Sequence, residues 1–143
     1  MPPKSASDYL EELERVLDEM QAVFIATVSG RFYAMDRYKN WDRVKKAEEV
    51  IFECKGKICK NVEPSKVLKE LYQTGIIDEH LEPLVFLDDT GHGYKVEKND
   101  GVFFFNYRPD RARQLSQKIL NRKHSHNLFF VTMTEYDKTF EAE

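Results

Sequence analysis

Apolar residues recur every three or four positions in four stretches of the chain, which is the spacing of one face of an α-helix. Ser7 and Asn40 stand at the start of two of these stretches as candidate N-caps, and Pro64 and Pro109 suit the first turns of the other two. Four amphipathic helices are therefore predicted, over residues 7–20, 40–52, 64–74 and 108–120.

Apolar runs rich in β-branched and aromatic residues mark three strands, at residues 23–28, 102–105 and 128–131. In the first of these strands, the residues at odd and at even positions are both apolar, which is typical of a strand buried on both faces. Residues 83–87 form a weaker candidate strand, which we expect to join a hairpin at one edge. Strands that alternate with amphipathic helices predict an α/β domain with three layers, in which a mainly parallel sheet carries helices on both faces. The three strong strands are expected to be neighbours in this sheet.

The composition indicates one globular domain of 143 residues, with 41% hydrophobic and 33% charged residues. No apolar run approaches the ~20 residues that span a bilayer, and the N-terminus lacks the apolar core of a secretion signal, so we expect a cytoplasmic protein with no membrane partner. The net charge of −3 argues against nucleic-acid binding, although residues 108–124 would form a basic helix.

Cysteine and histidine residues show no spacing typical of metal ligands. Cys54 and Cys59 are expected to be reduced thiols, as is usual in a cytosolic protein. The tripeptide His-Ser-His at residues 124–126 is expected to lie in a solvated loop. We therefore predict no metal site in this chain.

Arginines follow two of the strong strands. Arg31 and Arg37 come after the first strand, and Arg108 and Arg111 after the second. If these strands are parallel, their ends meet at one edge of the sheet, beside the free N–H groups of the helix that begins at Pro109. A guanidinium group matches the oxygens of phosphate or carboxylate two at a time, so the pattern favours a site for a small phosphorylated acid, phosphate or sulfate.

Ion pairing at the surface is the competing interpretation of these arginines. Asp36 and Asp110 stand next to them in the chain and could simply neutralise them. Exposed pairs of this kind are common and contribute about 0–1 kcal/mol. The residues alone leave both interpretations open.

Four long strings in the chain resemble the phosphotransferase domain of cofactor-independent phosphoglycerate mutases. They are ATVSGRFYAMDR, NWDRVKKAEE, FFFNYRPDRARQL and VTMTEYD, and the similarity runs in the family's order from about residue 2 to 137. The resemblance implies a glycolytic isomerase that interconverts 3-phosphoglycerate and 2-phosphoglycerate. It implies a second, phosphatase-like domain with a nucleophilic serine and two divalent metals, manganese or magnesium. It also implies that Arg31, Arg37, Arg108 and Arg111 contact the substrate.

The sequence lacks other parts of the family's pattern. No segment supplies the serine nucleophile or the metal ligands, and the aspartate-bearing loop that precedes PPKSA in the family is missing. We therefore expect residues 1–143 to be a single partial phosphotransferase domain that binds substrate, has no catalytic residue and is inactive without the phosphatase domain. The alternative is a non-catalytic binding or interaction module. An incomplete sheet would expose an edge through which two copies could associate.

Overall fold

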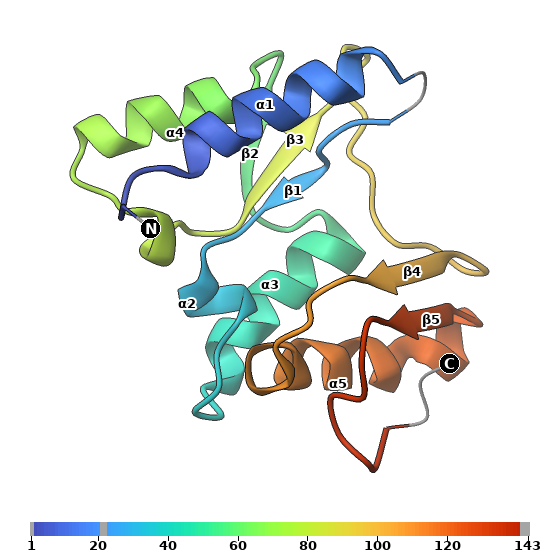
Figure 1. Cartoon of the computed structure of the whole chain (residues 1–143). Coiled ribbons are helices and arrows are strands. Elements are labelled where there is room, and N and C mark those ends of the chain that lie inside the picture. Colours follow the sequence, from blue (N-terminus) through green and yellow to red (C-terminus); the bar gives the residue numbers. More distant parts are fainter. Residues whose placement is uncertain (1, 21–22, 141–143) are drawn as a thin grey trace.

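The chain forms two small sheets, and helices pack between them (Figure 1). The computed structural model describes residues 2–20 and 23–140. Within them, a three-stranded sheet has the order β1–β3–β2, and a two-stranded sheet pairs β4 with β5. The α/β class is confirmed, and two of the three strand pairs are parallel. The expectation that the three strong strands share one sheet is wrong, because the first of them lies in the larger sheet and the other two form the smaller one.

Strand β3 (Leu84–Leu87) lies in the centre of the larger sheet. Its first three residues are buried, so this strand, and not residues 23–28, is the one covered on both faces. It pairs parallel with β2 (Lys57–Lys60) and antiparallel with β1 (Thr27–Val28). The predicted edge hairpin is therefore wrong. The segment after β3 returns to it through an isolated bridge between Leu87 and Gly93.

The two outer strands of this sheet show why the residue pattern predicted the strands of the sheet wrongly. In β2 only Cys59 is buried, while lysines at both ends of the strand face solvent, as is common in edge strands. That pattern gives almost no apolar signal. In the stretch before β1, Val23 and Phe24 are 44% and 41% exposed, so the predicted buried strand reaches its neighbour only at its last two residues.

Helices cover both faces of the larger sheet, as predicted. α1 (Ala6–Asp18) and α4 (Pro64–Gln73) pack on the face that carries Leu84 and Phe86. On the other face lies α3 (Trp41–Glu53), where Val50 and Val85 are both fully buried beside Gly56. The three layers are therefore α1 with α4, the sheet, and α3.

Carboxylates from distant segments complete the N-termini of α1 and α4. The Asp78 carboxylate accepts hydrogen bonds from the backbone N–H groups of Ser5 and Ala6, at 3.0 and 3.1 Å. The Glu14 carboxylate accepts hydrogen bonds from the Ser65 N–H and hydroxyl groups, at 2.8 and 2.6 Å. Each bond satisfies a donor that has no partner inside its own helix. Helix α1 begins one residue earlier than the sequence predicted, and its cap residue is Ser5 instead of Ser7 and makes no side-chain cap bond.

Strand β4 (Gly101–Phe104), helix α5 (Pro109–His126) and strand β5 (Phe129–Thr132) form a β–α–β unit. The two strands are parallel, with Gly101 opposite Phe129, which confirms that they are neighbours. The expected loop at residues 124–126 is wrong, because these residues form the last turn of α5. Basic side chains suit that turn since they face the negative end of the helix dipole.

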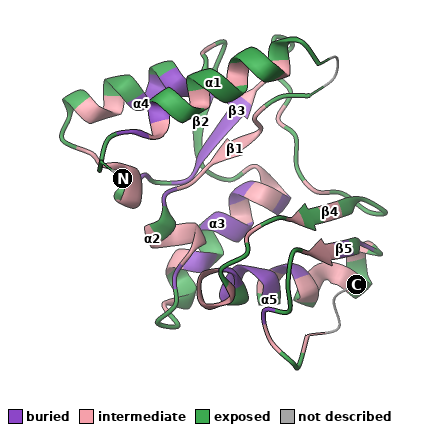
Figure 2. Ribbon diagram, in the orientation of Figure 1, coloured by how far each residue is buried: buried purple, intermediate pink, exposed green. Residues whose placement is uncertain are grey.

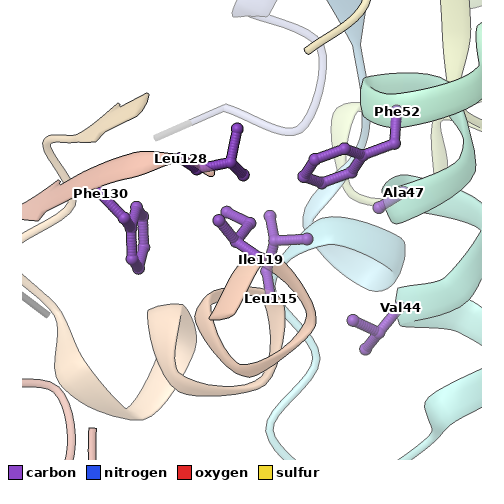
Figure 3. Packing of buried hydrophobic residues seen from close by; sticks show 7 residues of the cluster. All are labelled: Val44, Ala47, Phe52, Leu115, Ile119, Leu128 and Phe130. Atoms are coloured by element: carbon purple, nitrogen blue, oxygen red, sulfur yellow. The ribbon is translucent and has the colours of Figure 1, made fainter. Parts of the chain in front are cut away.

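A second core joins this unit to the rest of the molecule (Figure 3). Side chains from α3 meet side chains from α5 and the β5 segment. The buried members are Val44, Ala47, Phe52, Leu115, Ile119, Leu128 and Phe130. Helix α3 thus contacts both the larger sheet and α5, and Figure 2 shows buried residues along α3 and α5. Among the described residues, no helix is long and apolar enough to span a bilayer.

Candidate anion site at four arginines

Arg31 begins the short helix α2 (Arg31–Ala34), immediately after β1. The residue before it, Gly30, donates its N–H to the Leu81 carbonyl at 2.9 Å and lies against the 3-10 helix η1 (Asp78–His80). A Cβ atom on Gly30 would stand 2.5 Å from the Glu79 carbonyl oxygen, so only glycine fits this close approach. The glycine therefore places Arg31 beside Glu79.

An ion pair joins these two residues. Arg31 Nη2 lies 2.7 Å from Glu79 Oε2, and the two side chains are 54% and 38% exposed. The hydrogen bond from Arg31 lowers the pKa of Glu79, and the charge of Arg111, which approaches from α5, lowers it slightly further. Glu79 thus lies within the field of two of the four arginines.

Asp110, in the first turn of α5, joins two more arginines. Arg37 Nη1 and Arg108 Nη2 each lie 3.3 Å from its Oδ2 atom, and Arg108 Nε donates to its Oδ1 atom at 3.4 Å. The hydrogen bond from Arg108, followed by that from Arg37, lowers the pKa of Asp110. Arg37 also donates to the Tyr38 hydroxyl at 2.9 Å. The side chains of Arg37 and Arg108 are 39% and 59% exposed, so an incoming anion can reach both.

Arg111 ties the start of α5 to the segment after α2. Its Nη1 donates to the Met35 carbonyl oxygen at 3.0 Å. Because Met35 lies between Arg31 and Arg37 in the chain, this bond brings the first pair of arginines to the second pair. The start of α5 and the loop between α2 and α3 can be followed in Figure 1.

Asp36 is the buried anchor of this arrangement, at 4% exposed. Its carboxylate accepts hydrogen bonds from the Tyr38 N–H at 2.9 Å, from the Asn40 N–H and side-chain amide at 3.0 and 2.8 Å, and from the Gln114 amide at 3.1 Å. Arg43 lies 3.7 Å away. Burial alone would raise the pKa of Asp36, but these hydrogen bonds outweigh it and the pKa lies below its ordinary value.

The structure thus brings all four predicted arginines into one region, but for a different reason from the one the sequence suggested. Arg31 and Arg108 follow strands of separate sheets, and β1 runs antiparallel to its neighbour. The shared sheet edge is therefore wrong. Contacts among α2, η1 and the start of α5 gather the side chains instead.

The competing ion-pair interpretation holds in part. Asp110 does pair with Arg37 and Arg108, whereas the ion pair of Asp36 is with Arg43. Sequence reasoning missed Glu79 and Gln114. Glu79 stands 48 positions from Arg31, and Gln114 stands 78 positions from Asp36. No local pattern could have identified either residue.

A hollow lies elsewhere in the molecule. It has a volume of about 710 Å³ and lies between α1 and the ends of β2 and β3, and none of the four arginines is among its lining residues. Within the described residues, no group of three or more His, Cys, Asp or Glu side chains could hold a metal ion. The arginines therefore lie outside this hollow, and three of them, Arg31, Arg37 and Arg108, are exposed.

Comparisons with known proteins identify the family. Residues 1–138 match the family model described as the BPG-independent PGAM N-terminus (iPGM_N). The chain belongs to this family. It is 41% identical over 146 residues to the 2,3-bisphosphoglycerate-independent phosphoglycerate mutase of Clostridium novyi, and 41% identical over 150 residues to that of Listeria innocua. The resemblance noted in the sequence is confirmed.

The chain spans less than a third of the length of these relatives. The alignments cover 98% and 99% of this iPGM_N chain but only 28% and 29% of the two mutases. A crystal structure of phosphoglycerate mutase from Leishmania mexicana at low cobalt concentration shares the fold, with a TM-score of 0.80 over 96% of this chain and 28% of that one. Its sequence identity is 19%, so this likeness concerns the fold alone. The chain therefore corresponds to part of the N-terminal region of a phosphoglycerate mutase.

The buried anchor gives the first prediction. We expect Asp36→Asn to lower the free energy of unfolding by about 1–3 kcal/mol at pH 7, because four hydrogen-bond donors then face a weaker acceptor. The folded-state pKa of Asp36 is lowered, so its stabilisation is present above the ordinary carboxylate pKa and is lost as the pH falls through the lowered value. Urea unfolding should show the difference between variant and parent shrinking below about pH 5.

The matched control is Asp89→Asn, because Asp89 is exposed. It should change the free energy of unfolding little at any pH. A destabilisation by Asp36→Asn that stays the same down to about pH 2 would contradict the role given to the Asp36 carboxylate.

Proposed function

We propose that this chain is the substrate-holding part of a phosphoglycerate mutase. It binds 3-phosphoglycerate or 2-phosphoglycerate through Arg31, Arg37, Arg108 and Arg111. The observation that carries the proposal is the gathering of four guanidinium groups, those of Arg31, Arg37 and Arg108 exposed and that of Arg111 partly buried, around the carboxylates of Glu79 and Asp110. The mutase relatives supply the identity of the substrate.

The charge at the site supports an anionic ligand. Four guanidinium groups and two carboxylates leave a net charge of +2 (4 − 2). Like charges a few ångströms apart in partly exposed surroundings repel by on the order of 1 kcal/mol or more. A phosphate group carries about −1.5 to −2 charges near neutral pH, and the carboxylate of glycerate adds another. A phosphorylated acid therefore offsets the excess, and it can take over donors that Glu79 and Asp110 now occupy.

The task of these residues is binding and orientation. Phosphoryl transfer depends mostly on positioning and charge stabilisation, and a guanidinium fork fixes a phosphate or carboxylate by two parallel hydrogen bonds. The resemblance implies that the serine nucleophile and two divalent metals, manganese or magnesium, belong to the phosphatase domain. The described residues do not offer the ligands of such a metal centre. The partners proposed are therefore the phosphorylated acid and the phosphatase domain, in the cytoplasm where glycolysis takes place.

A non-catalytic binding module is the second candidate. One specific observation favours it, namely an exposed aromatic surface on the smaller sheet that the arginine site does not use. In that case the chain would serve as an interaction partner and the arginines would be surface ion pairs.

Replacing Arg108 with alanine separates the two candidates. The variant should bind 3-phosphoglycerate at least about tenfold more weakly, since a charge-assisted hydrogen bond contributes roughly 1.5–3 kcal/mol. Its free energy of unfolding should change by less than about 1 kcal/mol, because the lost ion pair is exposed. Calorimetric titration and urea unfolding give the two quantities.

The matched control is Arg15→Ala, an exposed arginine on α1 whose loss should leave the affinity unchanged. The substrate-holding proposal fails if the parent chain does not respond to phosphoglycerate or phosphate and Arg108→Ala is strongly destabilised. That outcome would make the arginines structural.

Catalysis gives a further prediction. The purified 143-residue chain should not convert 3-phosphoglycerate to 2-phosphoglycerate, with or without added manganese, because no segment of its sequence resembles those that carry the family's serine nucleophile and metal ligands. Phosphorus NMR follows both isomers directly in the same sample. Conversion that copurifies with the chain and disappears in Arg108→Ala would overturn this prediction, whereas conversion that Arg108→Ala leaves unchanged would indicate a contaminating enzyme.

A further inference from the structure

The loop after α2 holds Tyr38 directly beside Arg37. Tyr38 is 71% exposed, so its side chain does not belong to either hydrophobic core. Its backbone is nevertheless held, because the Tyr38 N–H donates to the buried Asp36 carboxylate at 2.9 Å. Lys39, the next residue, has a φ angle of 62°, in the left-handed region that tight turns use. The Tyr38 side chain therefore starts from a fixed point next to the arginine site.

Two contacts join the Tyr38 side chain to the Arg37 guanidinium group. Arg37 Nη2 donates a hydrogen bond to the Tyr38 hydroxyl oxygen at 2.9 Å, and the guanidinium carbon lies 5.1 Å from the centre of the Tyr38 ring. A cation at this distance from an aromatic face is attracted to it. Through its other terminal nitrogen, Nη1, Arg37 donates to Asp110. The guanidinium group is thus held between a neutral oxygen and a charged one.

The neutral acceptor distinguishes Arg37 from Arg31. Arg31 Nη2 lies 2.7 Å from Glu79 Oε2, which is the length of a strong charge-assisted hydrogen bond. Arg37 approaches Asp110 only to 3.3 Å, and Asp110 pairs with a second arginine as well. A tyrosine hydroxyl orients a guanidinium group without neutralising its charge. Positive charge therefore remains in excess on the Arg37 side of the site.

The Tyr38 hydroxyl also limits what Asp110 can take from Arg37. A guanidinium group and a carboxylate favour a pair of parallel hydrogen bonds, which here would turn Nη1 and Nη2 of Arg37 together onto Asp110. That pair would occupy the same fork of donors that a phosphate or carboxylate of a ligand needs. Because Nη2 donates to Tyr38 instead, the Arg37 fork is not closed by Asp110.

We propose that Tyr38 is a positioning residue of the anion site. Its hydroxyl holds the Arg37 guanidinium group with Nη2 turned away from Asp110, so that an anionic group of the ligand can take the fork. On binding, Nη2 exchanges a neutral acceptor for a charged one, which makes a stronger hydrogen bond. The inference rests on the proposed function, since it states how one of the four arginines is kept available for the phosphorylated acid.

Tyr38→Phe tests this proposal, because it keeps the ring and removes only the hydroxyl. Calorimetric titration with 3-phosphoglycerate, and separately with inorganic phosphate, should show binding about three- to tenfold weaker than to the parent chain. The midpoint of urea unfolding should stay the same, since the lost hydrogen bond is exposed.

The pKa of Asp110 gives a second measurement, which a merely structural role of Tyr38 would not change. Hydrogen bonds from Arg108 and then Arg37 lower this pKa in the parent chain. In Tyr38→Phe, Arg37 is free to pair more closely with Asp110, and a closer cation favours the charged carboxylate. The pKa of Asp110 should therefore fall further, which a pH titration of the ¹³C-labelled carboxyl groups by NMR measures.

Tyr107→Phe is the matched control. Tyr107 stands directly before Arg108, as Tyr38 stands directly after Arg37, and it is 76% exposed. Unlike Tyr38, it makes no hydrogen bond or ring contact with an arginine within residues 2–20 and 23–140. Its loss of a hydroxyl should leave both the affinity and the pKa of Asp110 unchanged.

The outcomes separate this inference from the proposed function. If the parent binds 3-phosphoglycerate and Tyr38→Phe binds it equally well, the inference is overturned while the proposed function stands. Equal weakening by Tyr38→Phe and Tyr107→Phe overturns it too, and so does weaker binding with an unchanged pKa of Asp110. If the parent binds neither 3-phosphoglycerate nor inorganic phosphate, the proposed function fails and the role of Tyr38 fails with it.

Discussion

The buried carboxylate of Asp36 determines how the two halves of the arginine site meet. It satisfies donors from its own loop at Tyr38 and Asn40, and it accepts a hydrogen bond from Gln114, which lies on α5. A buried charge of this kind is stable only when its hydrogen bonds are satisfied, so the loop and the helix must keep one relative position. That relative position of loop and helix brings Arg37 next to Asp110, so the spacing of the arginines at the surface depends on it.

The exposed carboxylates beside the arginines have a different role. Glu79 and Asp110 hold their partners through ion pairs that solvent screens, so these pairs contribute little to stability. They do reduce the repulsion among four cations while no ligand is bound. A phosphorylated acid would compete for the same donors. The arrangement therefore combines a rigid buried anchor with pairs that exchange easily, which is what a binding site needs when its ligand must be released again.

Local patterns predicted the helices well because each has a continuous apolar stripe. They failed where pairing is not local. The pattern predicts β3 at an edge although it lies in the centre, and β2 has too few apolar residues to give a strand signal. The second and third strong strands are neighbours as predicted, since a single helix joins them, but nothing along the chain indicated that they form their own sheet. The four arginines could be chosen from sequence. Glu79 could not, because it stands 48 positions from its partner.

The central claim is that these arginines bind a phosphorylated acid. NMR observation of the guanidinium Nε–Hε groups of the ¹⁵N-labelled chain during a titration with 3-phosphoglycerate tests it most directly. We expect four signals to move together with one dissociation constant, and we expect salt to weaken the effect. These signals belong to Arg31, Arg37, Arg108 and Arg111. Signals that stay in place at saturating ligand, or that move equally at Arg15 on α1, would contradict it.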